Sequence, residues 1–521
     1  MLMSKSLWAA MAALVFLTTS AAASVTVTLS AAAGHPSLDV KVSGSGFSPD
    51  EAVDVYFDTT DELLAFTDDS GNLAAEDLII PASALPGPHW ITAIGRKNGD
   101  GNHAAFTVRT DWTTFGFTER GRRFNPYENV LNTTNVSSLD LDWTTRTSGL
   151  IDSSPTVSGG RLYVGSYDHK IYALNPATGA VLWSVITGGN VYSSPAVAKG
   201  ILYAGSTDGK VYSLNAATGA TRWTVTTLGQ VLSSPAVANG IVYAGSMDGK
   251  VYALNAATGA TVWTYTTAGS VRSSPTVADG VVYIGSNDFN IYALDAATGA
   301  LLWAHGTSQQ VTGGGAVANG LVYFGSTDGS IYALSAANGS LFWSVPTGGL
   351  VESTPAISKG VVYVQSDDGF LYALDAGTGA QVWKVATPGG GVSSPAIANG
   401  VAYLGTLNGR ICAYSVSNGV KLWQAFAGSI VYSSPTVVDG VVYSASQDGK
   451  VYAYAINGGD AAVYKRDPSP PAYASLHPDF KLKARSHGEI LNFLNIGDGN
   501  DGGEQDQTHE SQRLKIHRGD R

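Results

Sequence analysis

Eight tryptophans recur along this 521-residue chain at a constant interval of 40 residues. They are Trp143, Trp183, Trp223, Trp263, Trp303, Trp343, Trp383 and Trp423. A repeat of this length does not bury its apolar residues alone, so such repeats stack into a solenoid or close into a propeller. The contents of one repeat decide between these two architectures.

One repeat, residues 231–270, consists of short runs of β-branched and aromatic residues separated by turn-forming pairs. Asn239-Gly240 and Asp248-Gly249 tolerate the positive φ angles of tight hairpins, so each pair marks a chain reversal between antiparallel strands. About ten residues for each strand and turn give four strands per repeat. A helical repeat would instead place apolar residues three and four positions apart. We therefore predict an all-β chain with an eight-bladed β-propeller, because a closed ring protects the strand edges.

The two ends of the repeat array indicate how the ring closes. The last repeat runs to Tyr452 but has no tryptophan 40 residues after Trp423, and Trp143 lacks the preceding strands of its own repeat. We predict that Leu139–Thr147 forms the outer strand of the last blade. The alternative is that Ala462–Lys465 forms this strand.

The segment Ala253–Trp263, ALNAATGATVW, resembles the tryptophan-docking motif of the quinoprotein repeat family, named after pyrroloquinoline quinone (PQQ). Similar copies begin at Ala173, Ser213, Ala293, Ala333, Ala373 and Ala413. The resemblance covers Trp112 to Tyr454 and implies a propeller whose tryptophans are wedges between blades, each aimed by the Thr-Gly turn of its own repeat. The repeats are also similar to those of the propeller proteins of the outer-membrane barrel-assembly machinery.

PQQ-dependent alcohol dehydrogenases resemble this chain in their blades, and the resemblance implies what a cofactor site would contain. Such enzymes hold PQQ with a disulfide between adjacent cysteines, a stacked tryptophan, and Asp, Glu and Asn around calcium. This chain has a single cysteine, Cys412, at a position where the other repeats have tyrosine. We expect Cys412 to be a small core residue, and we predict no catalytic, metal or cofactor site. A PQQ- and calcium-dependent dehydrogenase without the disulfide remains the enzyme alternative.

Two further residue types recur in the repeats with structural explanations. The second-strand tyrosines are interpreted as interblade core rather than a sugar-binding ladder; they are Tyr163, Tyr203, Tyr243, Tyr283, Tyr323, Tyr363, Tyr403 and Tyr443. The hairpin residues are interpreted as turn formers, one per blade and too far apart to share a metal ion. They are Asp168, Asp208, Asp248, Asp288, Asp328, Asp368, Asn408 and Asp448.

One position differs in nearly every repeat, the second residue of each unit at the entry to the innermost strand. These rim residues are Asp152, Tyr192, Leu232, Arg272, Thr312, Glu352, Val392 and Tyr432. Packing that repeats eightfold does not require so many different side chains, so we predict that they surround the channel mouth and form a binding rim together with Gln310. In the fifth repeat, Gly313–Gly315 replaces Ser-Ser-Pro, which would open a pocket. The alternative explanation is unconstrained surface variation.

The segments outside the repeats predict export and a second domain. Residues 1–23 have the layout of a secretory signal peptide, with Lys5 before an apolar run and a small-residue cleavage site before Ser24. Residues 24–110 alternate apolar and polar positions as a small β-sandwich does. The run Gly44–Glu51 resembles Ig-like domains of the transcription-factor/plexin type found in bacterial surface proteins.

The propeller is then expected over residues 111–464 and a largely disordered tail over 465–521. A net charge of −11 offers no basic surface for nucleic acid, and no apolar run after the signal peptide is long enough to span a membrane. We predict a monomeric, non-catalytic protein of the cell envelope or extracellular space that binds a protein or an extracellular polymer through its channel rim. The alternatives are the PQQ-dependent dehydrogenase and a glycan-binding surface adhesion protein.

Overall fold

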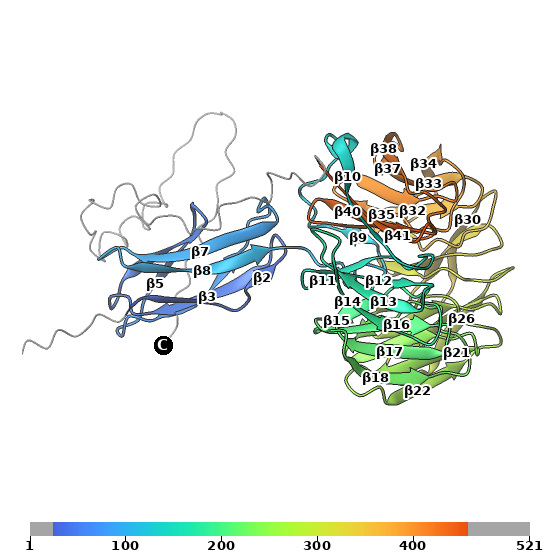
Figure 1. The fold of residues 1–521 in the computed structure, drawn as a ribbon, viewed down its shortest axis with the longest axis horizontal. Helices are drawn as coiled ribbons and strands as arrows, with labels where there is room; N and C mark the ends of the chain where they lie inside the picture. The colour runs from blue at the N-terminus through green and yellow to red at the C-terminus, as the bar shows by residue number, and fades with distance from the viewer. Residues whose placement is uncertain (1–23, 457–521) are drawn as a thin grey trace, which may run out of the picture.

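Strands account for nearly all regular structure of residues 24–456, the part of the chain that the computed structural model describes (Figure 1). The one exception among these residues is a short 3-10 turn, η1 (Val136–Ser138). None of the described residues belongs to a helix long and apolar enough to cross a membrane. The predicted signal peptide, the tail and the alternative closing strand 462–465 lie outside the described residues. The predicted all-β fold class is confirmed.

The first eight strands form two sheets that share one apolar core. One sheet has the order β1 (Thr26–Leu29), β3 (Asp39–Ser45), β6 (Leu73–Ile79). The other has the order β2 (Ala33–Gly34), β8 (Gly101–Val108), β7 (Gly87–Gly95), β4 (Ala52–Phe57), β5 (Thr60–Phe66). Residues from both sheets, such as Val40, Val55 and Phe106, pack in this core. Whether these two sheets belong to the Ig-like transcription-factor/plexin type stays a prediction.

Eight sheets of four antiparallel strands follow, one of them with a fifth short strand, β9 (Phe124–Asn125). The innermost strands are β11 (Thr156–Ser158), β15 (Ala196–Ala198), β19 (Ala236–Ala238), β23 (Thr276–Ala278), β27 (Ala316–Ala318), β31 (Ala356–Ser358), β35 (Ala396–Ala398) and β39 (Thr436–Val438). The second strands are β12 (Arg161–Ser166), β16 (Ile201–Ser206), β20 (Ile241–Gly245), β24 (Val281–Gly285), β28 (Leu321–Gly325), β32 (Val361–Ser366), β36 (Val401–Gly405) and β40 (Val441–Ser446).

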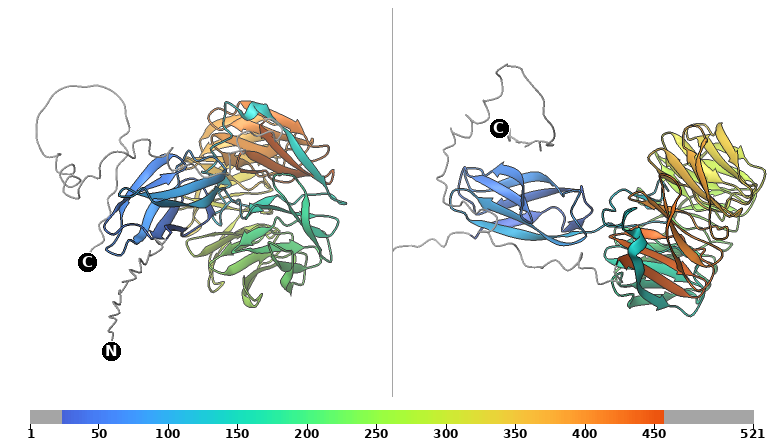
Figure 2. Two further views of the ribbon diagram at one scale, coloured as in Figure 1. Left: turned by 60° about the vertical axis from the view of Figure 1, so that its left-hand side comes forward. Right: turned by 90° about the horizontal axis from the view of Figure 1, so that it is seen from above.

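The third strands are β13 (Lys170–Leu174), β17 (Lys210–Asn215), β21 (Lys250–Asn255), β25 (Asn290–Asp295), β29 (Ser330–Ser335), β33 (Phe370–Asp375), β37 (Arg410–Ser415) and β41 (Lys450–Ile456). The outer strands are β10 (Leu139–Arg146), β14 (Val181–Ile186), β18 (Thr221–Thr226), β22 (Thr261–Thr266), β26 (Leu301–Gly306), β30 (Leu341–Pro346), β34 (Gln381–Ala386) and β38 (Lys421–Phe426). Each innermost strand contacts that of the next sheet, and β39 contacts β11. The sheets therefore form a closed β-propeller, with the two-sheet domain to one side of the ring (Figure 2).

The ring is closed by pairing between its two ends. Strand β10 lies antiparallel to β41, with Leu139 opposite Ile456 and Arg146 opposite Lys450. The predicted closing strand at Leu139–Thr147 is therefore confirmed. This pairing joins residues from opposite ends of the propeller, so opening the ring costs a complete strand ladder.

The repeated tryptophans join neighbouring blades. Trp263 is 8% exposed, and its Nε1–H donates to the carbonyl oxygen of Ala296 in the next repeat at 2.9 Å. Gly299, in the Thr-Gly turn of that next repeat, has φ +74°, and a Cβ there would lie 2.6 Å from Cδ2 of Trp263. Each Thr-Gly turn thus leads into the strand that carries its own tryptophan and, in addition, contacts the tryptophan of the preceding repeat. The turn packs on the tryptophan of the preceding repeat, because glycine alone allows both the positive φ and the close approach.

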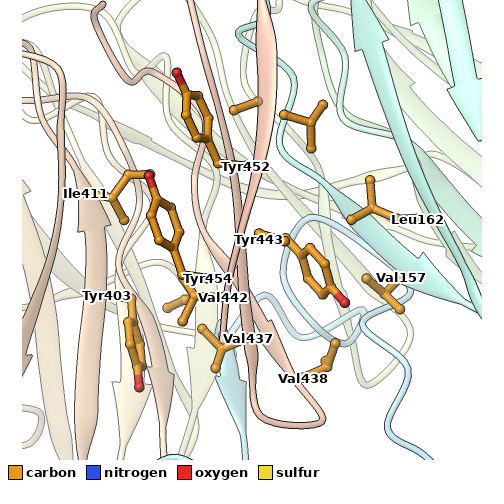
Figure 3. Close-up of a cluster of buried hydrophobic side chains, with 14 of the residues drawn as sticks. Val157, Leu162, Tyr403, Ile411, Val437, Val438, Val442, Tyr443, Tyr452 and Tyr454 are labelled. Carbon is orange, nitrogen blue, oxygen red and sulfur yellow. The ribbon is translucent and has the colours of Figure 1, made fainter. Parts of the chain in front are cut away.

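The second-strand tyrosines and Cys412 are core residues, as predicted. Figure 3 shows Tyr403 and Tyr443 among the valines of one interblade cluster. Tyr443 is 4% exposed, and its hydroxyl donates to the carbonyl oxygen of Pro176. Cys412 is fully buried in another cluster, where burial raises the pKa of its thiol to about 11. These residues stabilise the packing between blades rather than form a site.

Candidate functional site: a channel closed at one end

Residues 112–125 run across one end of the ring, and we call them the plug segment. Their carbonyl oxygens accept hydrogen bonds from the innermost strands of six of the eight blades, at Val157, Val197, Val277, Val317, Ile357 and Ile397. Strand β9 at the end of the segment pairs in parallel with β35. One short segment is thus bonded to most of the blades, and it closes one end of the central channel.

Arg123 anchors the plug segment from inside the ring. Its side chain is fully buried, and the guanidinium donates to the carbonyl oxygens of Phe115, Pro395 and Pro435. The guanidinium also lies 4.6 Å from the centroid of the Phe115 ring. Burial lowers the pKa of Arg123 to about 9. No carboxylate pairs with this guanidinium in the described part of the chain, so the three backbone carbonyl groups stabilise its positive charge.

Beyond the plug segment the channel forms a cavity of about 700 Å³. All eight rim residues line this cavity, and Phe115 from the plug segment lines it as well. The structure therefore brings together the positions that vary most between repeats. Gln310 does not line the cavity: its side chain is exposed, and its carbonyl oxygen accepts the N–H of Thr327.

The triple glycine of the fifth repeat borders two hollows of the propeller. Gly313 and Gly314 line the cavity, but a Cβ on Gly315 would lie 2.5 Å from the ring of Phe324. Phe324 is larger than its counterparts in the other repeats, such as Ala204 or Ala244. Gly314 and Gly315 also line a second, smaller pocket together with residues of the plug segment. The Phe324 ring fills the space that a side chain at position 315 would take, and a binding pocket opened by the triple glycine stays a prediction.

One side of the cavity is acidic and aromatic. The Asp152 carboxylate accepts hydrogen bonds from the Tyr167 hydroxyl and, at 3.0 Å, from Nε2 of Gln447. The Tyr167 ring lies 4.3 Å from that of Tyr192, and Tyr432 follows on the neighbouring blade. The pKa of Asp152 is raised overall, because the effect of burial exceeds the lowering by the two hydrogen bonds and by the charge of Arg272. The carboxylate is held in place by neutral donors.

The opposite side holds an ion pair. Nη1 of Arg272 lies 3.5 Å from Oε1 of Glu352, and the Thr312 hydroxyl donates to the same oxygen at 3.3 Å. These three residues come from three consecutive blades. The only cationic rim residue is therefore already partnered by a carboxylate.

A ring of hydroxyl groups also lines the cavity, which the sequence analysis did not predict. Each hydroxyl oxygen accepts the backbone N–H of the matching residue one blade earlier, at 2.8–3.0 Å. Its members are Ser154, Ser194, Ser234, Ser274, Thr354, Ser394 and Ser434. The ring is interrupted at Gly314, which has no hydroxyl for the N–H of Ser274. Each hydroxyl keeps its own proton for a ligand or water.

The cavity residues do not fit PQQ with calcium. No group of three His, Cys, Asp or Glu side chains with metal-binding geometry occurs among residues 24–456. The cavity is lined by tyrosines and Phe115 rather than tryptophan, and the single cysteine is buried between blades. PQQ carries three carboxylates, whereas the cavity offers one arginine that is already paired. The donor set and the charge both disagree with this cofactor.

The sequence profile of the family described as outer membrane protein assembly factor BamB matches residues 130–233, 207–313 and 287–469. These three overlapping stretches cover more than half of the chain. The chain belongs to this family. The match supports the PQQ-repeat propeller predicted from the tryptophan-docking motif, and no curated protein sequence matches the chain.

Solved structures share the propeller fold at low sequence identity. BamB from Moraxella catarrhalis is 20% identical with a TM-score of 0.54, covering 61% of this chain and 99% of that one. A quinohemoprotein alcohol dehydrogenase from Comamonas testosteroni is 18% identical with a TM-score of 0.60, covering 68% and 82%. The computationally designed protein Ika8 is 20% identical with a TM-score of 0.55, covering 60% and 98%. Identities this low show the fold alone.

Proposed function

We propose that this BamB-family chain is an exported, non-catalytic β-propeller that binds a protein partner through the open end of its channel. The observation that carries this proposal is the convergence of the eight rim residues on one cavity. The repeated tryptophans, tyrosines and glycines provide the packing between blades, so this packing does not constrain the identity of the rim residues. Residues that differ between blades yet face one cavity form an asymmetric surface suited to a single ligand.

The plug segment gives the binding a direction. Because residues 112–125 close one end of the channel, a partner enters only from the end lined by the rim residues. The linker before the ring is held against the two-sheet domain, since the His35 and Tyr127 rings stack 3.8 Å apart and Asn129 donates to the carbonyl oxygens of Ala82 and Ala84. These contacts favour a fixed spacer role for the N-terminal domain.

The family name supports a place in the cell envelope and a protein as the partner. The quinohemoprotein dehydrogenase shares the fold, but the charge and donor set of this cavity argue against a dehydrogenase activity here. A glycan ligand would occupy the same cavity, so the experiment below distinguishes a glycan from a protein partner.

The test is site-specific photo-crosslinking in the source cells. A photoreactive amino acid at Leu232 or Val392, both in the cavity, is expected to give a crosslinked protein adduct, whereas the same group at Leu302 on the outer strand β26 gives none. A triple Ala substitution at Arg272, Glu352 and Tyr432 is expected to abolish the adduct. Adducts from Leu302 alone, or a cavity ligand that is a glycan on a glycan array, would overturn the proposal.

A further inference from the structure

We propose that the acidic side of the channel cavity receives a cationic group, a lysine or arginine side chain carried on an exposed segment of the partner protein. This inference rests on the proposed function, because it names the chemistry of the group that enters the same cavity.

The charges around the cavity are unequal. Asp152 and Glu352 line the cavity, and among residues 24–456 Arg272 is the only lysine or arginine that does. A third carboxylate, Asp367, lies close enough for its charge to raise the pKa of Tyr432, after the larger effect of burial and together with Asp152 and Glu352. A cleft lined by an excess of one charge concentrates ligands of the opposite charge, and low-dielectric walls strengthen this field. The cavity therefore favours a cation over an anion.

The carboxylate of Asp152 is the acceptor in the cavity that lacks a cationic partner. Glu352 is paired with Arg272 at 3.5 Å, whereas no basic side chain among residues 24–456 forms an ion pair with Asp152. The Tyr167 hydroxyl and the Gln447 amide orient the Asp152 carboxylate and occupy only part of its acceptor capacity. A ligand N–H group therefore meets a carboxylate that is held in a fixed orientation.

The residues beside Asp152 suit an organic cation rather than a metal ion. Tyr192 and Tyr432 lie on the two blades next to that of Asp152 and line the same cavity. Aromatic faces attract ammonium and guanidinium groups, and the apolar stem of lysine or arginine packs on such rings. Leu232 and Val392 extend this apolar surface on the next blades. A long, cationic amino-acid side chain fits all of these features.

The experiment measures binding of a defined peptide to the purified full chain by isothermal titration calorimetry. The probe is an acetylated, amidated peptide of alternating glycine and lysine with three lysines, compared with the same peptide carrying acetyl-lysine. We expect the lysine peptide to bind and the acetyl-lysine peptide to lose at least about tenfold in affinity. Asp152→Asn is expected to weaken lysine-peptide binding about tenfold, whereas Asp140→Asn on the exposed face of β10 leaves it unchanged.

Arg272→Met is the decisive variant, because its expected effect is tighter peptide binding, which a misfolded protein would not show. Removing this positive charge is expected to strengthen lysine-peptide binding several-fold, since the cavity becomes more negative. Weaker binding in Arg272→Met, equal binding of the acetyl-lysine peptide, or no effect of Asp152→Asn would overturn the inference. If the lysine peptide fails to bind while Leu232 still crosslinks to a protein, the cationic ligand is refuted and the proposed function stands. Failure of both refutes both.

Discussion

The contact between Trp263 and Gly299 predicts a coupling between two repeats that stability measurements can isolate. Trp263→Ala removes a nearly buried indole and its hydrogen bond to Ala296, which we expect to cost about 3–5 kcal/mol. The carbonyl oxygen of Ala296 keeps a second donor, the hydroxyl of Tyr243 at 2.9 Å. The loss therefore comes mainly from packing and the cavity that remains.

Gly299→Ala adds two separate costs. Its φ of +74° is unfavourable for alanine by about 1–2 kcal/mol, and the new Cβ meets the Trp263 ring at 2.6 Å, which adds about 1–3 kcal/mol. When Trp263 is already alanine, only the backbone cost remains. The double-mutant cycle is therefore expected to show a coupling of about 1–3 kcal/mol.

The assay is guanidinium unfolding of the full chain, followed by circular dichroism and by fluorescence so that coincident transitions support a two-state analysis. The matched control is Gly259→Ala. Gly259 lies in the same repeat as Trp263 but packs on Trp223, where its Cβ would lie 2.8 Å from Cδ2. We expect Gly259→Ala and Trp263→Ala to be additive. Coupling of Trp263 to Gly259 rather than to Gly299 would show that the assignment of turn to tryptophan is wrong.

Three other predictions concern the plug segment, an irregular pair in the sixth and seventh repeats, and the hairpins. Arg123→Met is expected to lower the free energy of unfolding by about 3 kcal/mol or more, because it leaves buried carbonyl groups without donors. The control Arg120→Ala, at an exposed ion pair, should cost under about 1 kcal/mol, and equal losses in denaturant unfolding would contradict the role of the plug segment. The side chain of Gln365 is buried beside Gly391, and neither its amide oxygen nor its amide nitrogen has a hydrogen-bond partner. The double substitution Gln365→Gly with Gly391→Val should therefore stabilise the chain by about 1–3 kcal/mol, whereas Gly391→Val alone should destabilise it; a thermal melt in which Gly391→Val alone is stabilising would refute this. Burial acts to raise the pKa of Asp368, but hydrogen bonds to its carboxylate lower the pKa overall. The carboxylate therefore stabilises the fold above its ordinary pKa of 3.8, and this stabilisation is lost as the pH falls through the folded-state pKa; below about pH 4 the free energy of unfolding should depend less steeply on pH in Asp368→Asn, and an unchanged slope would count against this.

Most of the propeller was predictable because its determinants are local and repeated. Turn pairs such as Asp248-Gly249 specify hairpins within a few residues, and a constant spacing specifies the ring without any knowledge of distant contacts. The same regularity made the variable positions visible, so the rim residues were found as a set. The contact of Gly299 with Trp263 was not predicted, because this turn lies next to its own tryptophan in the chain but packs on the preceding tryptophan in space.

The plug segment and the charge arrangement of the cavity were not predictable in this way. Residues 112–125 have no repeated counterpart, and their hydrogen bonds reach strands as far along the chain as that of Val437. Gln310 stands two positions before the rim residue of its repeat, yet its side chain is exposed outside the cavity.

The periodic sequence specified the ring, its closing strand and the positions free to vary, since short-range turn chemistry repeated eight times leaves few alternatives. Contacts between residues far apart in the chain determined the rest: which end of the channel is closed, that Arg272 pairs with Glu352, and that Asp152 forms no ion pair with a basic side chain among residues 24–456. Such contacts depend on how the blades are placed around the axis, and no local pattern encodes that placement.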